Sequence, residues 1–235
     1  MLRLASARCT HVEAIGHGRV RVNFDSKLTP APGQFALARL AATHDPYLPQ
    51  TVFPAQIWPD GFALELPAGD PARLHLNPGV DIVLFGPAGK RAPQIAAGTN
   101  LLLLANARPE RLLPLAMQAI GSAGAVTLLL GRPYPVEALD PEIEVRVGHL
   151  PTLVAEYVDW AEGVYIYTEP QQPTEIVKAM RAAGFDEAQV SVLLTPPMPC
   201  GTGACQACAV RTRRGWKLAC REGPLFPLAE LSLTD

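Results

Sequence analysis

Residues 199–226 read PCGTGACQACAVRTRRGWKLACREGPLF and hold four of the five cysteines of the chain: Cys200, Cys205, Cys208 and Cys220. Their spacing is C-x4-C-x2-C-x11-C. Gly201 and Gly203 lie between the first two, and residues without Cβ can adopt backbone angles that turn N–H groups toward a sulfur atom. Four thiols in so short a window indicate a metal or redox site.

This spacing is the plant-type ferredoxin arrangement of a [2Fe–2S] cluster, with a shortened last gap. A tight loop can supply three thiolates, and we expect Cys220 on the returning strand of a hairpin formed by residues 209–212 and 216–219. A four-thiolate zinc site and a pair of disulfides are the alternatives. Zinc ribbons usually present two C-x2-C knuckles, and only Cys205 and Cys208 form one here, so the cluster is favoured.

The bulk composition is that of an ordinary globular protein: 235 residues, 49% hydrophobic and 18% charged. A formal net charge of −2 argues against nucleic-acid or anionic-membrane partners. The N-terminus has no sustained apolar segment, and no apolar run is long enough to span a bilayer. We therefore expect a cytoplasmic protein, in which clustered cysteines bind metal, whereas the isolated Cys9 is a buried small hydrophobe.

Residues 1–96 contain short apolar stretches separated by turn residues, among them 19–24, 52–57, 62–66 and 82–85. Such spacing predicts a small antiparallel β-barrel domain. Residues 97–195 alternate between apolar runs (101–105, 126–130, 143–147, 164–167 and 190–194) and helical patterns (109–120, 153–160 and 173–183). This alternation predicts an α/β domain with a parallel sheet. Pro196 and Pro197 then open a third, cluster-binding domain, residues 196–235.

Several motifs resemble those of one family, the electron-transfer subunits of class 1B dihydroorotate dehydrogenase, which are ferredoxin-reductase-like. They are CGTGACQACAV (200–210), REGPLF (221–226), PGQF (32–35) and GPAG (86–89). The resemblance implies an FAD-binding barrel, a nicotinamide-binding α/β domain and a [2Fe–2S] segment. It also implies that electrons pass between NAD, FAD, the cluster and the FMN of a separate catalytic subunit.

The chain departs from this family where FAD would be held. The family's Arg-Pro-x-Ser element corresponds to residues 47–53, YLPQTVF. No arginine is present there to neutralise a pyrophosphate, and the hydroxyls of Tyr47 and Thr51 are weak replacements. FAD binding in the usual mode is therefore not expected. For Gly86-Pro87-Ala88-Gly89-Lys90-Arg91, a phosphate loop contacting flavin and an ordinary turn with solvated charges are both open.

The nicotinamide site departs further. The family's glycine-rich turn corresponds to residues 107–115, ARPERLLPL. Pro109 has no N–H for a pyrophosphate and Glu110 adds negative charge, although Arg108 and Arg111 leave a side-chain-held anion open. The family's later Cys-Gly-Pro motif corresponds to residues 167–170, YTEP. NAD(P)H binding is therefore not expected.

We therefore predict an electron-transfer subunit whose cluster relays single electrons to or from an FMN-bearing partner in a hetero-oligomer. A complete FAD/[2Fe–2S] NAD(P)H reductase and a zinc-stabilised interaction module are the alternatives, so whether the chain alone is an enzyme stays open. A basic cluster beside the cysteines either steers an acidic partner or is a solvated hairpin face; its members are Arg211, Arg213, Arg214, Lys217 and Arg221. No hydrolytic or phosphoryl-transfer motif is visible.

Overall fold

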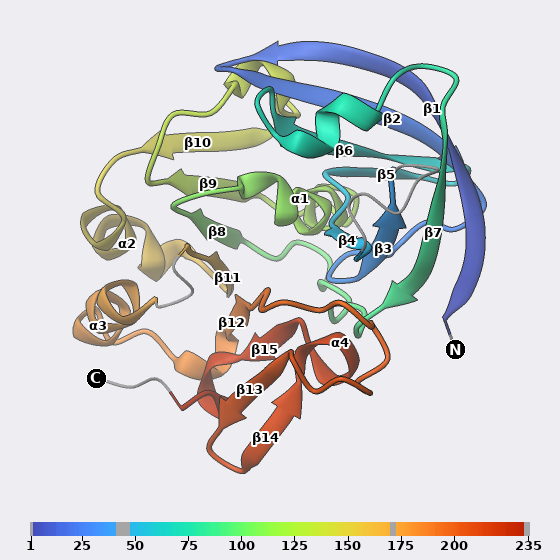
Figure 1. The fold of residues 1–235 in the computed structure, drawn as a ribbon. Helices are drawn as coiled ribbons and strands as arrows, with labels where there is room; N and C mark the ends of the chain where they lie inside the picture. Colours follow the sequence, from blue (N-terminus) through green and yellow to red (C-terminus); the bar gives the residue numbers. More distant parts are fainter. Residues whose placement is uncertain (1, 41–47, 170–172, 233–235) are drawn as a thin grey trace.

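The computed structural model describes residues 2–40, 48–169 and 173–232, and within them the chain forms three sheets (Figure 1). The first sheet is antiparallel and strongly curved into a barrel-like shape, with strand order β4-β3-β7-β1-β2-β6-β5. Its strands are β1 (Arg3–Gly16), β2 (Arg19–Ser26), β3 (Phe35–Arg39), β4 (Gln50–Val52), β5 (Gln56–Trp58), β6 (Gly61–Pro67) and β7 (Asp81–Ala88). The predicted antiparallel barrel is confirmed.

The barrel has its own apolar core. Phe24 on β2 and Phe62 on β6 are neighbours in the strand register, and their rings stack with centroids 5.2 Å apart. Cys9 is fully buried in the same core, as expected of a small hydrophobe, and burial raises the pKa of its thiol. A short 3-10 helix, η1 (Pro71–His75), covers part of this core before β7.

The second sheet has the order β10-β9-β8-β11-β12-β15, parallel from β10 to β12 and antiparallel between β12 and β15. Its strands are β8 (Leu101–Ala105), β9 (Val126–Leu130), β10 (Ile143–Val147), β11 (Gly163–Tyr167), β12 (Val190–Leu193) and β15 (Leu225–Pro227). Every residue of β8 and β9 is buried, as continuous apolar runs in a covered parallel sheet should be. The predicted α/β unit is confirmed.

Three helices lie against this sheet: α1 (Leu113–Ile120), α2 (Leu150–Tyr157) and α3 (Thr174–Ala182). Helix α1 contacts β8 and β9 and also β5, so it lies between the central sheet and the barrel, whereas α2 and α3 pack against each other (Figure 1). Short 3-10 turns complete the connections: η2 (Pro109–Arg111), η3 (Val136–Ala138), η4 (Val158–Trp160) and η5 (Glu187–Gln189). None of the described helices is long and apolar enough to cross a bilayer.

The C-terminal segment forms the hairpin of β13 (Ala209–Thr212) and β14 (Gly215–Leu218), then α4 (Ala219–Glu222), β15 and η6 (Leu228–Glu230). It is not an appendage, because β15 extends the central sheet and Phe226 is buried in its core. Phe35 and Leu37 of the barrel belong to that same core. All three parts of the chain therefore contribute to this core, which is separate from the core inside the barrel.

Five local differences from the sequence predictions are found. Strand β1 was not predicted, because most of its residues are partly or fully exposed and give no clean alternation. The stretch 52–57 is not one strand but the end of β4 and the start of β5. The helix expected at 109–120 begins as η2, and the one expected at 153–160 begins earlier, at Leu150, because Pro151 in a first helical turn has no N–H to lose. Cys220 lies in α4, beyond the end of β14.

Candidate metal centre

Residues 199–208 form an irregular loop between the central sheet and the hairpin. Gly201 and Gly203 adopt left-handed φ angles of 63° and 85°, as the sequence predicted for these glycines. A Cβ on Gly203 would lie 2.6 Å from Cδ of Arg221, and one on Gly201 would lie 3.0 Å from Cδ1 of Leu37. Both glycines therefore satisfy a conformational and a steric requirement of this loop.

The four predicted cysteines come together as two pairs. The sulfur atoms of Cys200 and Cys205 are 3.2 Å apart, and those of Cys208 and Cys220 are also 3.2 Å apart. None of the four is in a disulfide. Cys208 and Cys220 are buried, Cys205 is exposed and Cys200 is intermediate. One pair thus faces the interior and the other faces the surface.

The backbone around Cys220 is tied to both neighbouring parts of the chain. The N–H of Ala219 donates to the carbonyl of Cys208 at 3.0 Å, which links α4 to the end of the cysteine loop. The N–H of Gly89 donates to the carbonyl of Cys220, also at 3.0 Å, so the end of the barrel supports α4. Glu222 accepts from the N–H of Leu218 at 2.7 Å and closes the turn.

The paired arrangement fits a binuclear cluster. A [2Fe–2S] cluster held by four cysteines needs two thiolates on each iron, and each sulfur pair supplies two. A single tetrahedral zinc, with Zn–S of about 2.3 Å, needs all four sulfurs around one point. The two sulfur pairs therefore fit the cluster, and the C-x4-C-x2-C spacing, with a single C-x2-C knuckle, favours it over zinc.

The two pairs differ in their electrostatics. Desolvation acts to raise the pKa of the Cys200 thiol, but hydrogen bonds with Cys205 and Thr202 outweigh it and lower that pKa to about 6. Burial raises the pKa of the Cys220 thiol to about 12, and the neighbouring Cys208 adds to the effect. Cys200 is thus better stabilised as a thiolate than Cys220.

The basic cluster predicted from sequence lies on the surface beside the cysteines. Four of its members are exposed: Arg211, Arg213, Arg214 and Arg221. Lys217 instead forms an ion pair with Glu230. Trp216, on the same hairpin, is 69% exposed, which is unusual for a tryptophan. The hairpin therefore presents positive charge and an aromatic ring at the surface of the cysteine segment.

The stretch from Gly86 to Arg91 lies at the end of β7, beside the cluster segment. The N–H of Lys90 donates to the carbonyl of Gly223 at 2.6 Å, and a Cβ on Gly89 would lie 2.6 Å from Cδ of Pro224. Flavin contact by this stretch stays a prediction.

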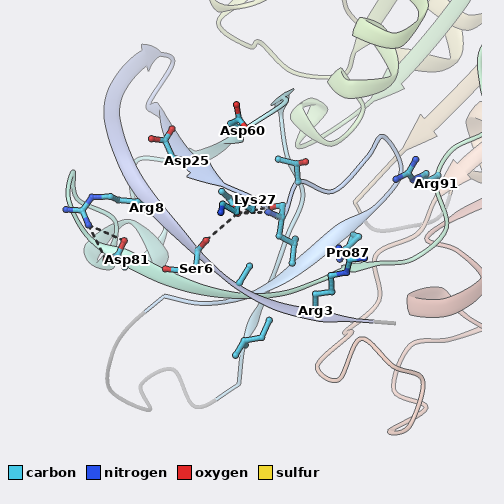
Figure 2. A pocket seen from close by; sticks show the side chains of 14 residues that line it. Arg3, Ser6, Arg8, Asp25, Lys27, Asp60, Asp81, Pro87 and Arg91 are labelled. Atoms are coloured by element: carbon cyan, nitrogen blue, oxygen red, sulfur yellow. Dashed lines mark hydrogen bonds and ion pairs between the residues drawn. The ribbon is translucent and has the colours of Figure 1, made fainter.

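Arg91 lines a hollow of about 1110 Å³ on the outer face of the barrel (Figure 2). The hollow mixes cations such as Arg3 and Lys27 with the carboxylates of Asp25 and Asp60. This mixture of charges indicates no particular class of ligand.

In the region where a dinucleotide would lie, the charged side chains are paired with one another. Arg108 and Arg111, which could have held an anion, face Glu169 at 3.4 and 4.0 Å. Glu110 is buried and pairs with Arg19 of the barrel at 2.7 Å. Tyr47 and Pro170, named in the sequence argument, lie outside the described residues. The roles of Glu110 and Arg111 were not predictable from local sequence, because their partners lie in distant segments.

An antiparallel barrel, a parallel α/β sheet and a four-cysteine segment packed on both define a chain of the ferredoxin-reductase type that carries an iron–sulfur segment. The family model of the iron–sulfur cluster binding domain of dihydroorotate dehydrogenase B matches residues 196–232. The predicted resemblance to the electron-transfer subunits of that enzyme is confirmed, and with it the iron–sulfur chemistry of the segment.

Of two relatives with this name, one matches most of the chain and the other a quarter of it. The electron transfer subunit of dihydroorotate dehydrogenase B (NAD(+)) from Shouchella clausii is 24% identical over 225 residues, which is 86% of each chain. The subunit of that name from Clostridium acetobutylicum is 44% identical over 58 residues, 25% of this chain and 24% of the relative. A solved structure of an NADH-dependent reduced ferredoxin–NADP oxidoreductase has a TM-score of 0.74 at 21% identity, covering 97% of this chain and 90% of that one. The structural likeness supports the fold.

Proposed function

We propose that this chain is an electron-relay subunit, with Cys200 and Cys205 as ligands of one iron and Cys208 and Cys220 as ligands of the other iron of a [2Fe–2S] cluster. The observation that carries the proposal is the grouping of the four sulfurs into two pairs, each 3.2 Å apart. When bound, such a cluster supplies a one-electron carrier whose potential depends on hydrogen bonds to sulfur and on solvent exposure.

The two sulfur pairs differ in how easily a partner protein can reach them. Cys208 and Cys220 are buried and face the shared core, whereas Cys205 is exposed. A partner can therefore approach the outer pair without unfolding any part of the chain. Arg221 and the hairpin arginines would favour an acidic partner surface, and Trp216 would provide apolar contact area. The chain's contribution is to hold the ligands, exclude water from the inner pair and present the outer one.

The proposed partner is an FMN-bearing catalytic subunit of the dihydroorotate-dehydrogenase type, in a hetero-oligomer. Relatives that match 86% and 83% of this chain are named as electron transfer subunits of dihydroorotate dehydrogenase B. The test is a stopped-flow mixing experiment with the dithionite-reduced protein and the FMN-bearing subunit encoded in the same genome. Reoxidation of the cluster at the rate of flavin reduction supports the relay, and an unchanged cluster spectrum contradicts it.

A complete NAD(P)H reductase on this chain is the alternative. It requires FAD and a nicotinamide site, and the turn after β8, where a buried glutamate and Pro109 stand, does not fit a nicotinamide dinucleotide well. NADH-dependent dye reduction by the purified protein separates the two functions. The relay predicts no turnover by the isolated chain, and turnover with one FAD per chain would establish the reductase.

A further inference from the structure

The strand order of the central sheet reverses between β8 and β11, and in open α/β sheets dinucleotides bind beyond the carboxyl ends of such strands. Here those two ends are tied together. The Asn106 side chain donates to the carbonyl of Glu169 at 3.0 Å and accepts from the N–H of Glu169 at 2.7 Å. The backbone N–H of Asn106 also donates to the carbonyl of Tyr167 at 3.4 Å. The crevice is therefore bridged by hydrogen bonds within the chain.

Arg111 fills the neighbouring space between the sheet and the barrel. Its guanidinium lies 5.1 Å from the centroid of the Phe53 ring, which belongs to the barrel, and 4.8 Å from that of the Tyr167 ring, which belongs to β11. Planar guanidinium groups stack well on aromatic faces. The planar guanidinium of Arg111 thus contacts two rings, one from the barrel and one from the central sheet.

Hydrogen bonds fix Arg111 in that position. Its Nη1 donates to the hydroxyl of Thr195 at 2.7 Å and to the hydroxyl of Tyr167. Thr195 ends the α/β domain and directly precedes the proline pair that opens the cysteine segment, so the contacts of Arg111 join the barrel to the α/β domain. Its side chain is only 15% exposed, and moving it would leave a buried charge without these partners.

The remaining space does not suit a flavin nucleotide. The cavity between β4 and η2 has a volume of about 250 Å³, whereas pockets for drug-sized ligands have about 300–1,000 Å³. Glu65 and Glu110, which are both buried, line this cavity. Glu65 bonds to Arg21 at 2.8 Å and to the Tyr134 hydroxyl, so its partners are also internal. Two buried carboxyl groups make the cavity unfavourable for a pyrophosphate.

We propose that Arg111 is an internal plug: its guanidinium occupies the slot between Phe53 and Tyr167 that an isoalloxazine ring would need. The chain therefore keeps the barrel and the α/β sheet as a rigid, flavin-free support for the cysteine segment. Whether Arg111 fills this slot does not depend on which cysteines bind the cluster.

The test is a titration of the purified full chain with lumiflavin, the isolated ring system, and with FAD, followed by quenching of flavin fluorescence. Wild type should bind lumiflavin only weakly and should not bind FAD. Arg111→Ala, which empties the slot, should bind lumiflavin at least about tenfold more tightly than wild type, a change of about 1.4 kcal/mol. Because Glu65 and Glu110 remain, the same variant should still reject FAD.

Arg108→Ala is the charge control, because Arg108 lies on the same turn and lines the same cavity, but it contacts Glu169, whereas Arg111 contacts the two rings. It should behave as wild type. Arg111→Gln keeps a hydrogen-bonding group for Thr195 and carries the test if the alanine variant does not fold. Wild-type protein that binds FAD in a one-to-one ratio overturns the plug, as does a folded Arg111 variant with no gain in lumiflavin affinity. Iron and sulfide content, measured on the same samples, reports on the cluster separately.

Discussion

Cys208 and Cys220 hold their sulfur atoms 3.2 Å apart although one ends the cysteine loop and the other lies in α4, beyond the hairpin. Cys200 and Cys205 form their pair within the loop itself. The inner pair therefore depends on the docking of hairpin, α4 and barrel, whereas the outer pair depends only on local backbone. The two pairs should respond differently to substitution.

Replacing an inner ligand should remove the cluster. Cys208→Ser leaves a buried position without its thiolate, and iron retention should fall by more than the roughly 10–100-fold typical of losing an outer hydrogen-bond partner. Iron analysis and visible absorption of anaerobically purified protein measure this. Cys9→Ala is the control: it alters the barrel core and should leave iron and sulfide at wild-type levels. Wild-type iron content in Cys208→Ser would exclude Cys208 as a ligand.

Gly203 should tolerate no side chain. Gly203→Ala combines a left-handed φ, which costs about 1–2 kcal/mol for a residue with Cβ, with a close approach to Arg221 and Leu218. Cluster content should fall together with stability. Gly184 has a similar φ of 77°, and no atom lies within 4 Å of the point where its Cβ would be, so Gly184→Ala should cost stability alone. Equal cluster content in both variants would contradict the steric role of Gly203.

The ion pair between Arg19 and Glu110 joins the barrel to the central sheet. Arg19→Met would leave Glu110 buried without its cation, and breaking such a pair costs about 3–5 kcal/mol. Arg8→Met removes an exposed pair with Asp81 and should cost about 0–1 kcal/mol. Urea denaturation compares the two variants. A similar small loss in both would show that the junction does not depend on this pair.

The ionisation of Glu110 should make the free energy of unfolding depend on pH. Burial raises the pKa of its carboxyl group above the usual 4.5, although Arg19 opposes the shift. The folded state then binds this proton more tightly than the unfolded state, so the stabilisation is present below the usual pKa and lost as pH rises through the raised one. The unfolding free energy of wild type minus that of Glu110→Gln should therefore fall as pH rises. A difference that is constant with pH contradicts this assignment.

The sequence predicts the parts of this molecule that depend on local pattern. Strands β8, β9, β10 and β13 coincide with the expected ranges, because apolar runs and turn residues bound them. Strand β1 was missed because its residues are largely exposed, and Cys220 was placed on a strand because a single turn of helix leaves no periodic signal.

The contacts between barrel and sheet could not be predicted from the sequence for a different reason. Phe53, Arg111, Tyr167 and Thr195 are far apart in the chain, and only the packing of the barrel against the α/β domain brings them together. Residues 107–115 showed that a glycine-rich turn was missing. They did not show that Arg111 would fill the vacated space.

The central claim is that the four cysteines hold a [2Fe–2S] cluster. Its most direct test is the iron, zinc and acid-labile sulfide content of anaerobically purified protein, combined with an electron paramagnetic resonance spectrum after reduction. We predict about two iron atoms and two sulfide ions per chain, with a one-electron signal on reduction. Stoichiometric zinc without sulfide would contradict the account.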